Sequence, residues 1–140
     1  MKSVIVPVGG SDSSLRALRY LIALHADGLR PQIHLVNVQV AMTGDVRQFV
    51  ASSDIRAYQQ EHSADALAPA RQLLDAAGVP YQVHEAVGSV ADQVVRMAEA
   101  LGCDHIVMGT HGRSALADLL VGSTTLRVMH QTSLPVVLIK

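Results

Sequence analysis

Short apolar runs rich in valine and isoleucine alternate with longer segments of helical periodicity along the chain, and this alternation constrains the fold most. The short runs predict five strands, at residues 4–8, 33–40, 81–87, 104–108 and 135–139. Apolar residues three or four positions apart predict helices at residues 13–26, 55–77, 90–101 and 123–131. Strands that alternate with helices pair in parallel and bury both faces of their sheet. We therefore expect an α/β fold with an open, parallel five-stranded sheet and helices on both faces.

The length and composition of the chain fit one folded domain over residues 1–140. Apolar residues make up 49% of the sequence and charged residues 16%, so the chain can bury a core. A net charge of -1 gives no electrostatic case for binding nucleic acid or an anionic membrane. No apolar run approaches the roughly 18 residues of a membrane-spanning helix, and a single cysteine, Cys103, excludes an internal disulfide. These features predict a cytoplasmic protein without a membrane span.

Glycine, serine and threonine gather in two segments near the end of the chain. Gly109-Thr110-His111-Gly112 follows the strand expected at residues 104–108, and its glycines allow backbone N–H groups to come close to a ligand. Gly122-Ser123-Thr124-Thr125 lies at an expected helix start, where open N–H groups and the positive dipole end favour an anion. The P-loop and the dinucleotide fingerprint both differ from this pattern, because one needs Gly-Lys-Ser/Thr and the other a third glycine. Together the two segments predict a phosphate site in two pieces.

The expected fold also predicts where this site lies. Ligands of open α/β sheets bind beyond the carboxyl ends of the strands, where the strand order reverses. The turns after residues 4–8 and after residues 104–108 are both rich in glycine. We expect these two turns to form the walls of one crevice.

The seven histidines invite a metal or catalytic interpretation. No two of them are spaced as a helical metal-ligand pair, and there is no Cys-x-x-Cys motif, so the metal content stays open. His111 lies inside the expected phosphate site, where it either shapes the loop or takes part in chemistry. No carboxylate or lysine is evidently placed to activate a water molecule, so no catalytic residue is predicted.

The same segments, in this order, resemble the universal stress protein family over essentially the whole chain. The resemblance rests on a Val-Pro-Val strand with a following Gly-Ser-Asp turn, a Leu-Val-Asn-Val strand, and the motif Gly109-x2-Gly112-x9-Gly122-Ser123. It implies a Rossmann-like fold and a homodimer that binds ATP or AMP, with or without Mg2+. It also implies a regulator or sensor in the stress response.

By this resemblance, residues of the two glycine-containing segments contact the nucleotide. Those that wrap the phosphates and the ribose from one side are Gly109, Gly112, Arg113 and Ser114. Those that donate to phosphate oxygens from the other side are Ser123, Thr124 and Thr125. Pro7 and Val38 line the adenosine. The phosphates are expected to order the loop 109–121 and so to change a surface that an unidentified regulatory partner contacts.

The first turn departs from the family pattern. The family usually has Asp-Gly-Ser there, with an aspartate that approaches the nucleotide, whereas this chain has Gly9-Gly10-Ser11. The missing carboxylate leaves two alternatives to a nucleotide-binding regulator: a dimeric interaction module with a weak or empty site, and a slow ATP hydrolase. The turn is also similar to the Ser-Gly-Gly-x-Asp-Ser loop of ATP pyrophosphatases, but Val8 replaces the serine and those enzymes normally have a longer chain.

The last expected strand, at residues 135–139, is apolar, and only Lys140 follows it. An apolar edge with free ladder groups favours association unless it is blocked. Two-fold pairing of identical edges satisfies these groups, so we expect a homodimer through residues 135–139. The alternative is a monomer whose edge is protected by Pro135 and Lys140.

Overall fold

The computed structural model describes residues 1–41, 51–110 and 121–140. Its strands are β1 (Ser3–Pro7), β2 (Gln32–Gln39), β3 (Gln82–Val87), β4 (His105–Gly109) and β5 (Val136–Ile139). Its described helices are α1 (Asp12–Ala26), α3 (Ser52–Ala77), α4 (Val90–Ala100) and α5 (Ser123–Gln131). In this part of the chain, no helix is long and apolar enough to cross a membrane.

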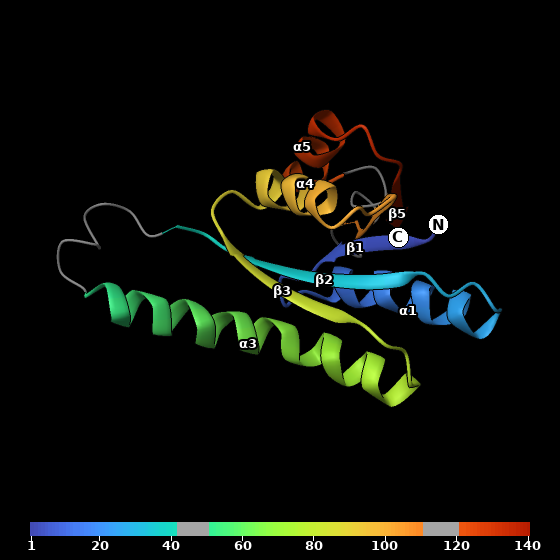
Figure 1. Ribbon diagram of the computed structural model, residues 1–140, viewed down its shortest axis with the longest axis horizontal. Coiled ribbons are helices and arrows are strands. Elements are labelled where there is room, and N and C mark those ends of the chain that lie inside the picture. Colours follow the sequence, from blue (N-terminus) through green and yellow to red (C-terminus); the bar gives the residue numbers. More distant parts are fainter. Residues whose placement is uncertain (42–50, 111–120) are drawn as a thin grey trace.

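The five strands form one sheet in the order β3-β2-β1-β4-β5, and every neighbouring pair is parallel. The chain first builds outwards from β1 to β3 and then returns to the other side of β1 with β4 and β5 (Figure 1). The strand order therefore reverses between β1 and β4. This confirms the predicted open, parallel five-stranded sheet.

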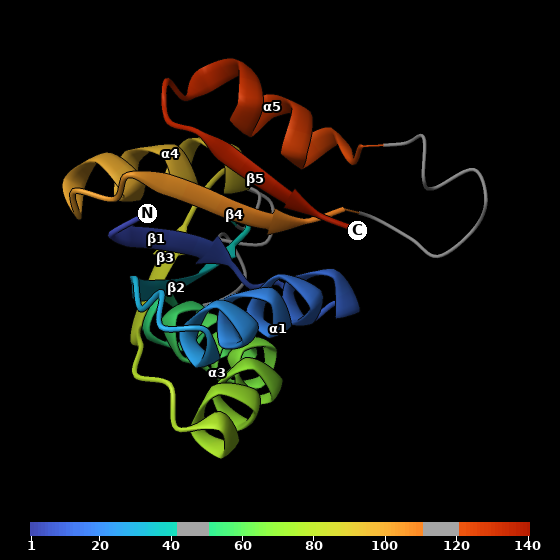
Figure 2. The same cartoon turned by 90° about the vertical axis from the view of Figure 1, so that its right-hand side faces the viewer.

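Helices cover both faces of the sheet, as predicted. Helices α1 and α3 lie on one face, and α4 and α5 lie on the other (Figures 1 and 2). Successive residues of a strand point to opposite faces, so Val4 packs into the α1–α3 core and Ile5 into the α4–α5 core. Because both faces are buried, β1, β2 and β4 read as nearly continuous apolar runs rather than as alternating ones.

The helix boundaries differ most from the prediction at α3. This helix begins at Ser52, three residues before the predicted start at 55. Its first residues, Ser52, Ser53 and Asp54, are polar and exposed, so they add nothing to the apolar period from which the start was predicted. The other described strands and helices begin and end within one residue of the predicted positions.

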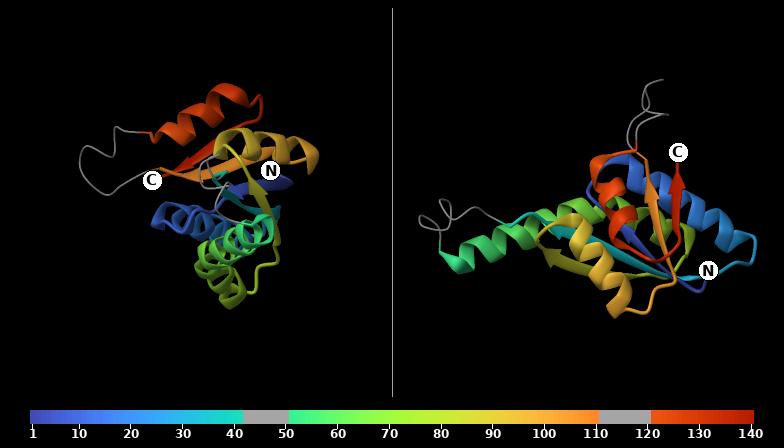
Figure 3. Two further views of the ribbon diagram at one scale, coloured as in Figure 1. Left: turned by 90° about the vertical axis from the view of Figure 1, so that its left-hand side faces the viewer. Right: turned by 90° about the horizontal axis from the view of Figure 1, so that it is seen from above.

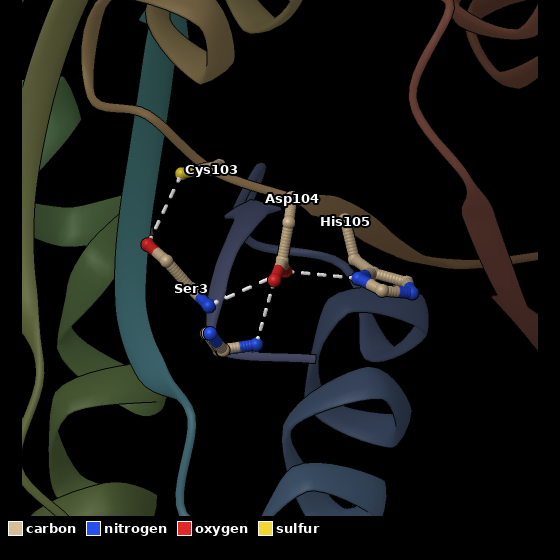
Figure 4. Close-up of polar contacts among 5 residues, drawn as sticks. Ser3, Cys103, Asp104 and His105 are labelled. Atoms are coloured by element: carbon tan, nitrogen blue, oxygen red, sulfur yellow. Dashed lines mark hydrogen bonds and ion pairs between the residues drawn. The ribbon is translucent and has the colours of Figure 1, made fainter.

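A carboxylate fastens the amino ends of β1 and β4 (Figure 4). Asp104 accepts hydrogen bonds from the backbone N–H groups of Lys2 and Ser3, at 2.8 and 3.3 Å. Its Oδ1 also lies 2.9 Å from Nδ1 of His105. The hydrogen bond from His105, together with those from the two backbone N–H groups, lowers the pKa of Asp104 to about 2. Burial raises the pKa of the neighbouring Cys103 thiol, which fits a packing role for that residue.

Candidate functional site

A small hollow lies beyond the carboxyl ends of β1 and β4, where the strand order reverses. Its volume is about 140 Å³. The residues that line it come from β1 and its following turn, from the first turn of α1, from β4 and from the start of α5: Pro7, Gly9, Ser11, Ser13, Ser14, Met108, Gly109, Thr124 and Thr125. The turn after β1, Gly109 at the end of β4, and Thr124 and Thr125 of α5 thus meet at one place.

Gly109 is the last residue of β4, and the first turn of α1 lies directly against it. A Cβ on Gly109 would lie 2.8 Å from Cα of Ser13 and closer still to the Ser13 carbonyl carbon and oxygen. Any side chain at this position would therefore push α1 away from the sheet. The glycine allows α1 and β4 to approach each other closely. This structural reason for a glycine at position 109 was not evident from the sequence.

Thr110 follows Gly109 and is held by the end of β5. Its N–H group donates to the carbonyl of Ile139 at 2.8 Å, and its hydroxyl group lies 3.4 Å from the same oxygen. The carbonyl of Thr110 accepts a hydrogen bond from Nη2 of Arg16 on α1. The two donors of Thr110 therefore face β5 rather than the hollow.

The start of α5 provides open backbone donors. Gly122 is the N-cap residue and makes no side-chain capping bond, and the N–H group of Leu126 donates to its carbonyl at 3.0 Å. The N–H groups of Ser123, Thr124 and Thr125 precede that bond, so they are the ones that an α-helix leaves without an intrahelical partner. An anion is favoured at such a position by these donors and by the helix dipole.

The other predicted residues fall into three groups. Pro7 is the last residue of β1 and lines the hollow. Val38 lies near the carboxyl end of β2 and packs against the α4–α5 core, outside the lining of this hollow. The predicted residues His111, Gly112, Arg113 and Ser114 lie outside the described residues.

Three features of the first turn were missed by the sequence analysis. Gly10 has a φ of 81°, a conformation that favours glycine. The hydroxyl groups of Ser11 and Ser13 lie 2.8 Å apart at the start of α1, beside the hollow. Asn37, buried in β2, donates to the carbonyl of Val8 at 2.6 Å and so fixes the chain where it leaves β1. A polar residue inside an otherwise apolar strand was the available signal for Asn37.

Two histidines meet between neighbouring strands, away from the hollow. Nδ1 of His34 in β2 lies 3.0 Å from Nε2 of His84 in β3. Burial of His34, together with the nearby His84, lowers the pKa of the His34 imidazole. Among the residues that the structure describes, no group of three or more histidine, cysteine, aspartate or glutamate side chains could hold a metal ion.

An open parallel sheet covered on both faces, with a hollow at its switch point, defines the class of α/β domains whose ligands bind at the carboxyl edge. The chain belongs to the universal stress protein family, whose family model matches residues 1–140.

Individual relatives share both sequence and fold with this chain. Universal stress protein MJ0531 of Methanocaldococcus jannaschii is 28% identical over 145 residues, which cover 99% of this chain and 82% of that protein. The solved structure of universal stress protein UspA from Lactobacillus plantarum has a TM-score of 0.76 at 20% identity, covering 99% of this chain and 97% of that one. A universal stress protein solved in complex with cAMP has a TM-score of 0.70 at 25% identity, with the same two coverages of 99% and 97%.

Proposed function

We propose that this protein binds an adenine nucleotide, ATP or AMP, at the carboxyl edge of its sheet and acts as a nucleotide-dependent regulator in the stress response. The observation that carries the proposal is the hollow at the switch point between β1 and β4, which the start of α5 also lines. The related universal stress protein in complex with cAMP supports adenine nucleotides as the ligand class.

The chemistry of the hollow suits a phosphate group. Hydroxyl groups of Ser11, Ser13 and Thr124 line it, and the open N–H groups of α5 lie at its border. A volume of about 140 Å³ does not hold a whole nucleotide. Thr124 also lines a second hollow, of about 450 Å³, between α5 and the start of α4. The phosphate would occupy the first hollow and the rest of the nucleotide would extend along the carboxyl edge.

The same lining favours binding over hydrolysis. Its described residues include no carboxylate and no lysine that could activate a water molecule or hold a metal ion.

The remaining alternative is a dimeric interaction module with a weak or empty site. The observation that favours it is the glycine at position 9, where the family usually has a carboxylate. A single buried cysteine needs no oxidising compartment, so we assign the protein to the cytoplasm.

A charge placed at the start of α5 tests the site. Thr124→Glu adds a carboxylate that repels phosphate, yet an acidic residue in a first helical turn favours the helix, and α5 has none there. Calorimetry should show ATP binding to the wild type and binding at least about tenfold weaker to Thr124→Glu, since one repelled phosphate contact costs more than about 1.4 kcal/mol. Thr124→Gln is close to glutamate in size but carries no charge, so it should bind ATP more tightly than Thr124→Glu does.

Ser53→Glu is the matched control, because it adds the same charge to the exposed first turn of α3, which does not line the hollow. Thermal unfolding checks that every variant folds. Equal ATP affinity of Thr124→Glu and Ser53→Glu would place the nucleotide elsewhere. A wild type that binds no adenine nucleotide would favour the interaction module.

A further inference from the structure

Arg16 reaches from α1 to the rim of the hollow. It lies three residues after Ser13, on the side of α1 that packs against the end of β4. Its Nη2 group donates to the carbonyl of Thr110, the residue directly after Gly109. Ser13 and Gly109 both line the hollow. The guanidinium group is therefore anchored one residue beyond the wall of the proposed phosphate site.

One donor of this guanidinium group is unused. The Nε atom of Arg16 is buried and has no hydrogen-bond partner among the described residues. Buried polar atoms in folded proteins nearly always have a partner, so an unpaired one calls for an explanation such as a bound ion or ligand. The two donors of Thr110 are already engaged by Ile139, so they do not compete for an anion at this corner.

We propose that Arg16 binds a phosphate oxygen of the nucleotide and gives the site its preference for charged over neutral adenine compounds. This inference rests on the proposed function and adds to it the residue that distinguishes phosphate-bearing from neutral adenine compounds. A guanidinium group has five N–H donors in a planar fork that matches phosphate, so it can hold the Thr110 carbonyl and a phosphate together. The described residues that line the hollow include no lysine or arginine, and Arg16 is the cation anchored beside it.

The charge of Arg16 sharpens the expectation. Neutralising Arg16 removes a positive charge beside the site, so the local potential for an anion becomes less favourable. Removal of the cation should therefore affect ATP more than AMP, and AMP more than adenosine, which carries no phosphate.

Arg16→Gln is the decisive variant, because glutamine keeps an N–H donor for the Thr110 carbonyl but loses the charge. Arg16→Lys keeps the charge and loses the planar fork. Arg19→Gln is the matched control, because Arg19 is an exposed arginine on the same helix. Calorimetry with ATP, AMP and adenosine, at low and at high KCl concentration, measures affinity for all four proteins.

We expect Arg16→Gln to bind ATP about tenfold more weakly or worse, as for a lost hydrogen bond to a charged group, and adenosine within about twofold of the wild type. Its ATP affinity should also depend less on KCl than that of the wild type, because salt screens the lost attraction. Arg16→Lys should fall between the wild type and Arg16→Gln, and Arg19→Gln should match the wild type.

Three results would overturn the inference. If Arg16→Gln lost ATP and adenosine affinity equally, Arg16 would act only by holding the end of β4. If Arg16→Gln or, should that variant not fold, the equally uncharged Arg16→Met bound ATP as the wild type does, the guanidinium group would have no part in the site, although the proposed function would stand. If the wild type bound neither ATP nor AMP, the inference and the proposed function would both fail.

Discussion

Gly109 lies where α1 comes closest to the sheet, and its missing side chain is what permits the contact with Ser13. The hollow depends on this contact, because Ser13 and Gly109 form two of its walls. A residue that the sequence marked for ligand binding therefore has a structural role as well. The two roles are compatible, since a helix start held close to the end of a strand brings its N–H groups to the same place.

Gly109→Ala should be strongly destabilising. The added methyl group overlaps the backbone of Ser13, and forcing extra atoms into a packed contact typically costs about 1–3 kcal/mol. Urea unfolding should show a loss within this range or above it. Gly9→Ala is the control, because no atom other than those of its chain neighbours lies within 4 Å of a Cβ there. A Gly109→Ala protein as stable as Gly9→Ala would mean that α1 shifts freely.

Gly9→Asp restores the carboxylate that the universal stress protein family usually has at this position. The open space around Gly9 accommodates a side chain, its φ is not positive, and the residue lines the hollow. An added hydrogen bond to the nucleotide contributes on the order of 1 kcal/mol, or a several-fold gain in ATP affinity. Calorimetry compares Gly9→Asp with Gly9→Ala. Weaker ATP binding by a folded Gly9→Asp protein would show that this turn has acquired another use.

Part of the candidate site could be predicted residue by residue, and part could not. Gly109, Thr124 and Thr125 follow from a motif and from the rule that ligands bind at the switch point, Pro7 follows from the family resemblance alone, and all four line the hollow. The contacts of Arg16 with Thr110 and of Asn37 with Val8 join residues that are far apart in the sequence. Local periodicity holds no information on which distant carbonyl a side chain reaches.

At the scale of strands and helices, burial explains which predictions were accurate. The strands of this sheet are buried on both faces at its centre, so continuous apolar runs marked β1, β2 and β4 clearly. All five strands and three of the four described helices match their predicted bounds within one residue at both ends, whereas the polar first turn of α3 was missed. Apolar periodicity marks the residues that are buried. It therefore cannot predict the start of a helix whose first turn is exposed to solvent.

The link between β1 and β4 at their amino ends should depend on pH. The pKa of Asp104 is about 2 in the folded protein, against 3.8 for an ordinary aspartate, chiefly because His105 donates to its carboxylate. Between these two values the unfolded chain binds more protons, so acid favours unfolding. The stability due to Asp104 is complete above about pH 4 and is lost as the pH falls towards 2.

Asp104→Asn isolates this contribution from those of the other carboxylates. Urea unfolding of the wild type and the variant should differ at pH 6, with the wild type more stable. The difference should shrink steadily below pH 4 as the wild-type carboxylate is protonated. A difference that stayed constant down to pH 2.5 would mean that the hydrogen bonds of Asp104 do not require its charge.

At the scale of the whole molecule, β5 forms one edge of the sheet among the described strands (Figure 3). All four of its residues are partly exposed. The carbonyl groups of Pro135 and Ile139 accept hydrogen bonds from the N–H groups of Ile106 in β4 and of Thr110, which directly follows β4. Backbone groups alternate in direction along a strand, so those of Val137 also face β4, and those of Val136 and Leu138 face outwards. We propose that two copies of the chain pair through these outward groups.

The alternation selects the variant that tests the dimer. Proline at Val137, the middle of the strand expected from the sequence, is the obvious variant. It would remove an N–H group that faces β4, so it would disrupt the sheet itself rather than the dimer. Leu138→Pro removes an outward N–H group instead. Sedimentation should show the wild type near twice the chain mass of 14.9 kDa and Leu138→Pro shifted towards the monomer. A wild-type monomer at tens of micromolar would contradict the dimer, and an unchanged dimer of folded Leu138→Pro would move the interface elsewhere.

Nucleotide binding at the carboxyl edge is the central claim, and native mass spectrometry of the gently purified protein tests it most directly. The chain should carry the added mass of one adenine nucleotide per 14.9 kDa subunit, either as purified or after addition of ATP. At the same ATP concentration, Thr124→Glu should show a clearly smaller fraction of nucleotide-bound subunits. A wild type that stays bare with ATP in excess would contradict the account.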